Sequence, residues 1–183
     1  MGETLNRPDF KRLVLLGFMG AGKSSVGPIL ARRFAWEFID LDSEIERSAR
    51  HSIPEIFASK GEAAFRKIEA EVTTRVIGRE RIVLAPGGGW LANEQVAERG
   101  SAGTVTVWLR VSPEEVLRRV GSRRDGRPLL AVADPDAAVR RLLSQREPLY
   151  READLTVDTD GRTAQAVATE IETLLNLRGS AAI

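Results

Sequence analysis

Residues 17–24 read GFMGAGKS, and this stretch decides the fold. It matches the phosphate-binding loop pattern G-x-x-x-x-G-K-[ST]. The apolar run LVLL precedes it at residues 13–16, and a helix-compatible stretch follows from Ser24 to Phe34, so the motif has the strand–loop–helix context it needs. Glycines let the backbone approach a phosphate, and the helix N-terminus adds partial positive charge there. The pattern predicts that Lys23 reaches the β- and γ-phosphates of a nucleotide and that Ser24 holds Mg²⁺. A chance glycine-rich turn is the alternative.

The composition is that of an ordinary globular domain. The 183 residues suffice for one domain with a sizeable core, and 29% charged with 43% apolar residues is a balanced mixture. A net charge of +1 gives no global field to attract nucleic acid. The absence of cysteine excludes disulfides, thiolate nucleophiles and zinc–thiolate sites. The chain shows no signal-peptide pattern and no apolar run that could span a membrane. We therefore expect a cytoplasmic protein, monomeric, with neither nucleic acid nor membrane as partner.

Short β-rich segments alternate with helical ones along the chain. The predicted strands are Arg12–Leu16, Glu37–Asp40, Ile82–Ala85, Val105–Leu109 and Leu155–Val157. The predicted helices are Lys23–Phe34, Asp42–Arg50, Ile53–Ser59, Glu62–Ile77, Pro113–Val120, Pro135–Arg151 and Thr163–Leu177. This alternation predicts an α/β fold with a parallel sheet and helices on both of its faces. We expect a single domain over residues 1–183, with a core at about 12–177 and mobile tails at 1–11 and 178–183.

Two insertions interrupt the alternation. The first, at about residues 41–78, is rich in helix and contains SIPE at residues 52–55, a capping box with proline in the first turn. The second, at about residues 121–135, reads GSRRDGRPLLAVADP and carries three arginines and two glycines. A basic loop of this kind in a nucleotide enzyme favours a lid that closes over phosphates. A plain solvated connector is the alternative.

Two acids and three glycines follow predicted strands, at the sheet edge where open parallel sheets bind ligands. Asp40 and Asp42 lie at the end of the second strand. One alternative is a helix cap, since aspartate suits that position. The pair also suits magnesium and hydroxyl binding. Asp40 could then reach the metal through water, and Asp42 could accept a hydrogen bond or a proton from an acceptor hydroxyl. Gly87, Gly88 and Gly89 follow the third strand. They predict a close approach of backbone to a ligand, with a tight turn as the alternative.

Two arginines are candidate ligands for an anion. Arg66 shares a predicted helix face with Glu62 and Glu69, which forms either a solvated ion-pair ladder or a guanidinium fork held for an anionic ligand. Arg146, in the segment REPLY at residues 146–150, has the same two interpretations. His51 is the single histidine, and no nucleophile elbow or thiol accompanies it, so we expect it on a solvent-facing turn rather than in a catalytic triad.

Taken together, these motifs resemble the shikimate kinase family. The resemblance rests on GFMGAGKSSVG at residues 17–27, the Asp40-Leu41-Asp42 segment, SIPEIF at 52–57 followed by the pairs at 61–62 and 65–66, the triple glycine, RPLL at 127–130 and R-x-P-L-Y at 146–150. These motifs occur in the family's order, and the resemblance runs from Arg12 to about Leu177. It implies a P-loop three-layer α/β/α sandwich like the nucleoside-monophosphate kinases, with five parallel strands in the order 2-3-1-4-5. It also implies transfer of the ATP γ-phosphate to the 3-hydroxyl of shikimate, giving shikimate 3-phosphate and ADP, in the route to chorismate and the aromatic amino acids.

The resemblance further implies a role for each matching residue. The ATP-binding residues would be Gly20, Ala21, Gly22, Lys23, Ser24 and Ser25, with Arg119 beside the adenine and Arg127 arriving with the lid. The magnesium-binding residues would be Ser24 and Asp40. The shikimate-binding residues would be Asp42, Arg66, Arg146, Gly87, Gly88, Gly89, Phe57 and Phe65, the two arginines holding the carboxylate. The catalytic residues would be Lys23, Asp42 and Arg127.

The sequence departs from the family pattern at two places. Trp90 stands where the family usually has a small or medium residue, and Ala85-Pro86 replaces a pair that often contains serine or threonine. Neither change removes a proposed catalytic group. The competing functions are another small-molecule kinase of this fold, such as a gluconate kinase, and a non-catalytic kinase-like sensor, which the presence of Lys23, Asp42 and Arg127 disfavours.

Overall fold

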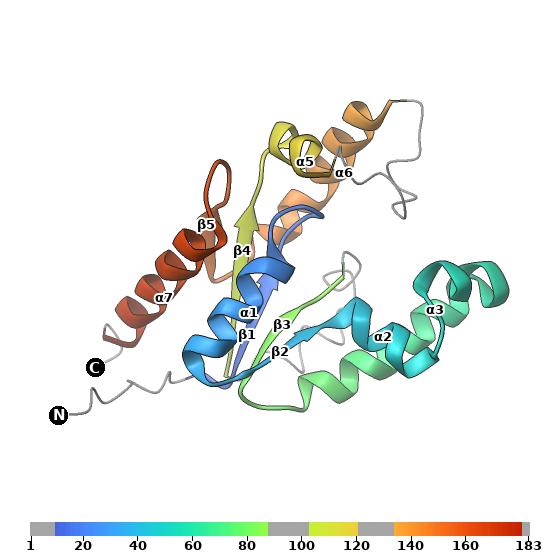
Figure 1. The fold of residues 1–183 in the computed structure, drawn as a ribbon, viewed down its shortest axis with the longest axis horizontal. Coiled ribbons are helices and arrows are strands. Elements are labelled where there is room, and N and C mark those ends of the chain that lie inside the picture. Colours follow the sequence, from blue (N-terminus) through green and yellow to red (C-terminus); the bar gives the residue numbers. More distant parts are fainter. Residues whose placement is uncertain (1–9, 88–102, 121–133, 181–183) are drawn as a thin grey trace.

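The computed structural model describes residues 10–87, 103–120 and 134–180, and these form one five-stranded parallel sheet with helices on both faces (Figure 1). The strands are β1 (Arg12–Leu16), β2 (Glu37–Asp40), β3 (Ile82–Ala85), β4 (Thr104–Arg110) and β5 (Leu155–Asp158). Their order across the sheet is β2-β3-β1-β4-β5, and every neighbouring pair is parallel. This confirms the order that the resemblance implied.

The described helices divide between the two faces of the sheet. They are α1 (Lys23–Phe34), α2 (Leu41–Ala49), α3 (Ile53–Ile77), α5 (Pro113–Val120), α6 (Pro135–Tyr150) and α7 (Ala164–Ser180). Leu13 and Leu15 of β1 face a core that includes side chains of α1 and α7. Val14 and Leu16 face the opposite core, which α2, α3 and Tyr150 at the end of α6 complete. Because successive strand residues point to opposite faces, this nearly continuous apolar strand buries both sides of the sheet.

The predicted elements agree with the observed ones except near their ends. The helix predicted from Asp42 begins at Leu41, and α7 continues to Ser180, beyond the predicted end at Leu177. The two helices predicted around Gly61 appear as one span, α3, but Gly61 itself has φ 77° and ψ 176°, which is not helical. Glycine adopts such a conformation without the steric cost that other residues pay. The break therefore separates the two halves of α3 where the prediction placed a boundary.

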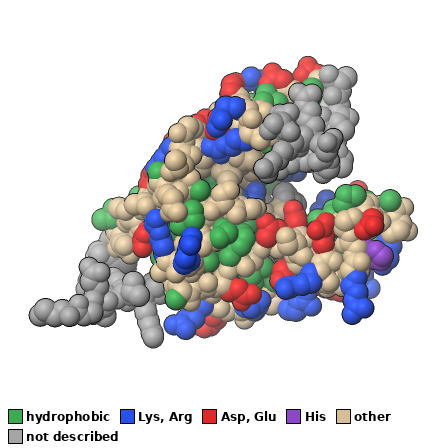
Figure 2. All heavy atoms as spheres, viewed as in Figure 1, with side chains coloured by type: hydrophobic (Ala, Val, Ile, Leu, Met, Phe, Trp, Pro, Cys, Tyr) green, Lys and Arg blue, Asp and Glu red, His purple; other side chains and the backbone are tan. Residues whose placement is uncertain are grey.

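The register of the sheet brings several chain segments to its carboxyl-terminal edge. Leu16 pairs with Trp108, Asp40 with Ala85, and Arg110 with Asp158. The strands thus end close to one level, and the segments that follow them share this edge of the sheet. Figure 2 shows a hollow there, between α3 and the part of the molecule that carries α5 and α6. Among the described residues, no helix is both long and apolar enough to cross a membrane.

Candidate active site

The loop of residues 17–24 turns from β1 into α1 around a lysine held by the loop's own carbonyl groups. Three glycines in it have positive φ angles, including Gly22 at 100°, where a side chain would be strained. Lys23 is the first residue of α1, and its Nζ donates to the carbonyl of Gly17 at 2.7 Å and to that of Phe18 at 3.2 Å. The loop therefore places an ammonium group beside a helix N-terminus, which together attract phosphate oxygens.

Ser24 and Asp40 come into direct contact from two different elements. The Oγ of Ser24, on α1, donates to Oδ2 of Asp40 at 3.0 Å, and Oδ1 of Asp40 accepts from the backbone N–H of Ser43 at 3.2 Å. Asp40 thus caps α2 and also contacts Ser24 of the loop. A hydroxyl and a carboxylate are the hard oxygen donors that Mg²⁺ takes, usually with substrate phosphates completing its shell. In the part of the chain that the structure describes, no group of three or more acidic or histidine side chains is arranged to hold a metal ion by itself.

Asp42, in the first turn of α2, lies against the start of the glycine segment after β3. A Cβ atom on Gly87 would be 2.6 Å from Oδ1 of Asp42, so only glycine fits there without displacing the carboxylate. Solvent reaches the side chain, but protein atoms surround most of it, and this partial desolvation raises the pKa of Asp42. The Asp40 carboxylate raises it further, and the Lys23 ammonium opposes the rise. The sequence-based placement of Asp42 beside Gly87 and the loop is therefore correct.

Arg66 is held by two glutamates of its own helix. Its Nη1 donates to Glu69 Oε2 at 2.8 Å and its Nη2 to Glu62 Oε1 at 3.3 Å. The Glu69 side chain is largely buried, whereas that of Arg66 is half exposed. The guanidinium also lies over the Phe65 ring at 5.3 Å, and the rings of Phe65 and Phe57 are 4.7 Å apart. The arrangement fixes an arginine fork beside an aromatic pair while leaving part of the guanidinium open to a ligand.

Arg146 approaches the phosphate loop from α6. Its guanidinium carbon lies 5.5 Å from the centroid of the Phe18 ring, and Phe18 is the first variable residue of the loop pattern. Such a cation over an aromatic face is an attractive electrostatic contact. The second arginine of the predicted pair is thus in contact with the nucleotide-binding loop itself.

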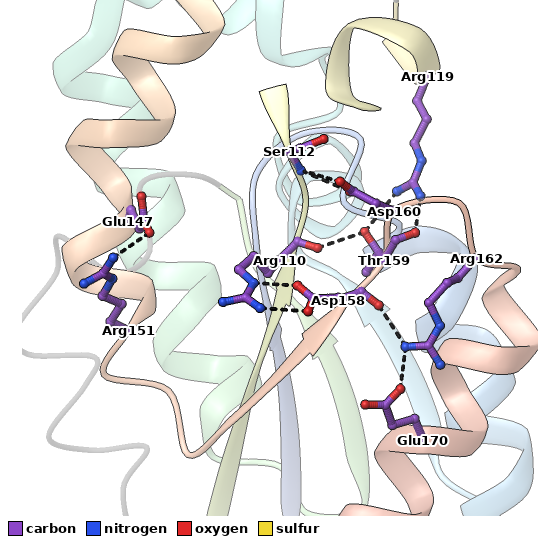
Figure 3. A network of polar contacts seen from close by, with 10 residues as sticks. All are labelled: Arg110, Ser112, Arg119, Glu147, Arg151, Asp158, Thr159, Asp160, Arg162 and Glu170. Atoms are coloured by element: carbon purple, nitrogen blue, oxygen red, sulfur yellow. Dashed lines mark hydrogen bonds and ion pairs between the residues drawn. The ribbon is translucent and has the colours of Figure 1, made fainter. Parts of the chain in front are cut away.

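Arg119, at the end of α5, joins the phosphate loop to the turn after β5 (Figure 3). Its Nη1 donates to the carbonyl of Gly20 at 2.8 Å, its Nη2 to the carbonyl of Thr159 at 2.5 Å, and its Nε to Glu115 at 2.7 Å. Protein acceptors therefore occupy most of the N–H groups of Arg119, and its side chain is 21% exposed.

Several predicted site residues lie outside the described part of the chain. They are Gly88, Gly89 and Arg127, together with residues 121–133 of the predicted lid. Asp134 and Pro135, at the end of that segment, are described, and Asp134 caps α6 by accepting the backbone N–H of Ala137 at 3.0 Å. His51 is exposed on a bend between α2 and α3, as expected.

Sequence reasoning missed four residues that contact the predicted ones. Phe18 and Tyr150 lie beside Arg146, and Glu115 and Thr159 bind Arg119. Tyr150 and Glu115 are each four residues from the arginine they accompany, so helical spacing could have indicated both. Phe18 and Thr159 are brought in from other elements, and no local pattern indicates them.

The comparisons with known proteins agree on one family. The sequence model of the family described as shikimate kinase matches residues 19–176. A shikimate kinase of Nitrobacter winogradskyi is 49% identical over 147 residues, which are 80% of this chain and 68% of that one. The structure of a shikimate kinase from Acinetobacter baumannii in complex with shikimate superposes with a TM-score of 0.86 at 38% identity, covering 92% of this chain and 94% of that one.

A different kinase shares the fold at a greater distance. A gluconokinase from Sinorhizobium meliloti has a TM-score of 0.62 at 19% identity, covering 93% of this chain and 94% of that one. At that identity the likeness shows a common fold and nothing about the substrate. The family match spans most of the sequence, whereas the gluconokinase shares only the architecture. This chain belongs to the shikimate kinase family.

Proposed function

We propose that residues at the carboxyl-terminal edge of the sheet bind the two substrates of a shikimate kinase. Such an enzyme transfers the γ-phosphate of ATP to the 3-hydroxyl of shikimate. The observation that carries the proposal is that the Asp42 carboxylate lies against Gly87 and near enough to Lys23 for the two charges to interact, so a candidate acceptor of the hydroxyl proton is close to the phosphate-binding cation. Phosphoryl transfer requires positioning and charge neutralisation more than covalent chemistry by the protein. This edge of the sheet offers both.

The donor half of the site is the loop and its neighbours. Its ATP-binding residues are Gly20, Ala21, Gly22, Lys23, Ser24, Ser25 and Arg119. Lys23 exchanges its contacts with the Gly17 and Phe18 carbonyls for phosphate oxygens, which are stronger partners because they are charged. Arg119 presents its face to the adenine. Ser24 and Asp40 hold Mg²⁺, which when bound neutralises charge on the β- and γ-phosphates.

The acceptor half is built from α2, α3, α6 and the segment after β3. Asp42 orients the shikimate hydroxyls, and its raised pKa makes it a better proton acceptor than an ordinary aspartate. Arg66 and Arg146 hold the carboxylate as charged hydrogen-bond donors. The residues proposed to line the ring are Gly87, Gly88, Gly89, Phe57 and Phe65.

The remaining assignments rest on the sequence and its resemblance to the family. Arg127 meets the transferring phosphate when residues 121–135 close as a lid, which excludes water as a competing acceptor. Residues 41–78 form the insertion that binds shikimate within a single kinase domain. We expect the enzyme to act as a monomer. We place the enzyme in the cytoplasm.

Release of ADP tests the proposal. The purified chain with ATP and Mg²⁺ is expected to release ADP when shikimate is added and not when gluconate is added. Lys23→Ala removes the loop cation and provides the inactive control; because its Nζ also binds the Gly17 and Phe18 carbonyls, the melting temperature of the variant is compared with that of the wild type. Equal ADP release with gluconate, or none with either acceptor, would contradict the proposal.

A further inference from the structure

The two arginines proposed for the shikimate carboxylate differ in what holds them. Arg66 has two glutamate partners, Glu62 and Glu69, which compensate much of its charge. Arg146 is half-buried and forms no ion pair with any carboxylate in the described part of the chain. A partly desolvated cation without a carboxylate must be held by other groups. In this structure those groups are aromatic.

The first group is the Phe18 ring. Phe18 is 1% exposed and belongs to the loop that binds phosphate, so its position is fixed by the core on one side and by the loop on the other. The Arg146 guanidinium lies 5.5 Å from its centroid. The quadrupole of an aromatic ring attracts a cation without carrying a charge of its own. The contact can therefore orient Arg146 and leave its full charge available.

The second group is the Tyr150 hydroxyl, one helical turn after Arg146. Tyr150 is 3% exposed, and its ring stacks on Trp108 with a centroid distance of 5.9 Å and an interplanar angle of 28°. Its hydroxyl is buried and has no hydrogen-bond partner of ordinary geometry among the described residues. Buried hydroxyls in folded proteins are nearly always paired, and leaving one unpaired destabilises the fold.

The environment of the hydroxyl identifies the group it faces. Burial raises the pKa of Tyr150, and the nearby charge of Arg146 opposes that rise. Arg146 and Tyr150 are four residues apart on α6 and therefore lie on the same helix face. The Tyr150 hydroxyl therefore lies close to the Arg146 side chain, without a hydrogen bond of ordinary geometry between them.

We infer that Phe18 and Tyr150 are positioning residues for Arg146, holding its guanidinium without neutralising it so that the carboxylate of the acceptor receives its full charge. When the carboxylate binds, a small shift of the guanidinium lets the Tyr150 oxygen accept one of its N–H groups, and the two other donor directions face the ligand. The inference rests on the proposed role of Arg146 in holding shikimate.

Tyr150→Phe separates this role from a purely structural one. We expect KM for shikimate to rise about 10- to 100-fold while kcat and KM for ATP stay within about twofold, as for the loss of one hydrogen bond to a charged group. The melting temperature should stay equal or rise, because the variant removes an unpaired buried hydroxyl. An unchanged KM for shikimate, or a fall in melting temperature with equal losses for both substrates, overturns the inference.

Phe18→Leu tests the ring. It keeps most of the apolar volume but removes the aromatic face, so KM for shikimate should rise in the same way. Phe34→Leu is the matched control, since the Phe34 ring packs against Phe10 and Trp36 and makes no cation–π contact in the described part of the chain. If both leucine variants raise KM for shikimate equally, packing rather than the cation contact is responsible and the inference fails.

Two further measurements distinguish failure of the inference from failure of the proposed function. Arg146→Ala that leaves KM for shikimate unchanged contradicts the proposed role of Arg146 itself. If Arg146→Ala raises KM but Tyr150→Phe and Phe18→Leu do not, only the positioning role is lost. In the Arg146→Ala background, Tyr150→Phe should have no further effect. With the uncharged methyl ester of shikimate, the wild type and Tyr150→Phe should have the same KM.

Discussion

Gly87 and the carboxylate of Asp42 are packed so closely that a methyl group on Gly87 would stand 2.6 Å from Oδ1. Gly87→Ala should therefore displace Asp42 rather than the rigid end of β3. Misplacement of a catalytic group by about 1 Å can cost on the order of 100-fold in rate. We expect kcat/KM for shikimate to fall by that order, measured in a coupled ADP assay, with KM for ATP unchanged. Gly78→Ala, whose added Cβ would meet no atom closer than 3.6 Å, is the control and should be fully active.

The raised pKa of Asp42 predicts an acid limb in the activity profile. A base must be ionised, so kcat/KM should fall as the pH drops through the folded-state pKa, at higher pH than for an ordinary aspartate. Asp42→Asn should lower kcat by roughly 10²- to 10⁴-fold and abolish that limb. A profile of Asp42→Asn that retains the same acid limb would assign it to another group.

The same carboxylate should cost the protein stability at neutral pH. A group whose pKa is raised in the folded state binds its proton more tightly there than in the unfolded chain, so stability increases as the pH falls through that pKa. At pH 7 the ionised Asp42 is therefore unfavourable. Asp42→Asn is expected to melt at an equal or higher temperature than the wild type while being nearly inactive, as measured by calorimetry. A clearly lower melting temperature would show that Asp42 has a structural partner.

Arg66→Ala should weaken the use of shikimate and leave the binding of ATP unchanged. Loss of a charged hydrogen-bonding group is worth about 1.5–3 kcal/mol, so kcat/KM for shikimate should fall roughly 10- to 100-fold. Nucleotide affinity, measured by titration with ATP, should not change. The control is Arg47→Ala, an exposed arginine on α2 whose partner among the described residues is Glu44 of its own helix. A loss of ATP affinity in Arg66→Ala would place that arginine in the other half of the site.

Glu115 should matter for ATP although it is proposed to touch neither substrate. It accepts from both Arg118 and Arg119, and the first of these contacts is the main cause of lowering its pKa to about 2, so the contact with Arg119 persists throughout the usual assay range. Glu115→Ala should loosen Arg119 and raise KM for ATP about 10- to 100-fold, as expected for one charged hydrogen bond, with KM for shikimate unchanged.

Glu114→Ala is the matched control for that variant, because Glu114 is exposed and pairs with Arg140 instead. Both variants remove one glutamate from the same turn of α5. If they raise KM for ATP equally, the effect comes from the net charge of the protein and not from the fixed position of Arg119.

Much of this architecture could be predicted from local patterns. The loop at residues 17–24 fixes the first strand and helix, and the alternation of apolar strands with amphipathic helices predicts a parallel sheet. Asp42 and Gly87 could be brought together because parallel strands end at one edge. Each of these inferences depends on residues near one another in the sequence or on a general rule of topology.

The missed contacts have a common physical cause. Phe18 follows β1 and Thr159 follows β5, and they meet Arg146 of α6 and Arg119 of α5 only because β1, β4 and β5 are neighbours in the sheet. Side-chain contact across elements depends on helix position and rotamer, which no periodicity encodes. The sequence likewise does not decide whether Asp40 caps a helix or binds another group. In the structure one carboxylate oxygen accepts from the Ser43 N–H and the other accepts from the Ser24 hydroxyl.

Phe18 has a consequence for the mutational tolerance of the loop. In the phosphate-loop pattern its position is one of the four that accept any residue, and a motif search treats a change there as silent. In this molecule the carbonyl of Phe18 accepts a hydrogen bond from Lys23, and its ring makes a cation–π contact with Arg146. Position 18 thus adjoins the cations proposed to bind both substrates. A library randomised over residues 17–24 should therefore contain few active sequences that vary at position 18, although the consensus pattern accepts any residue there.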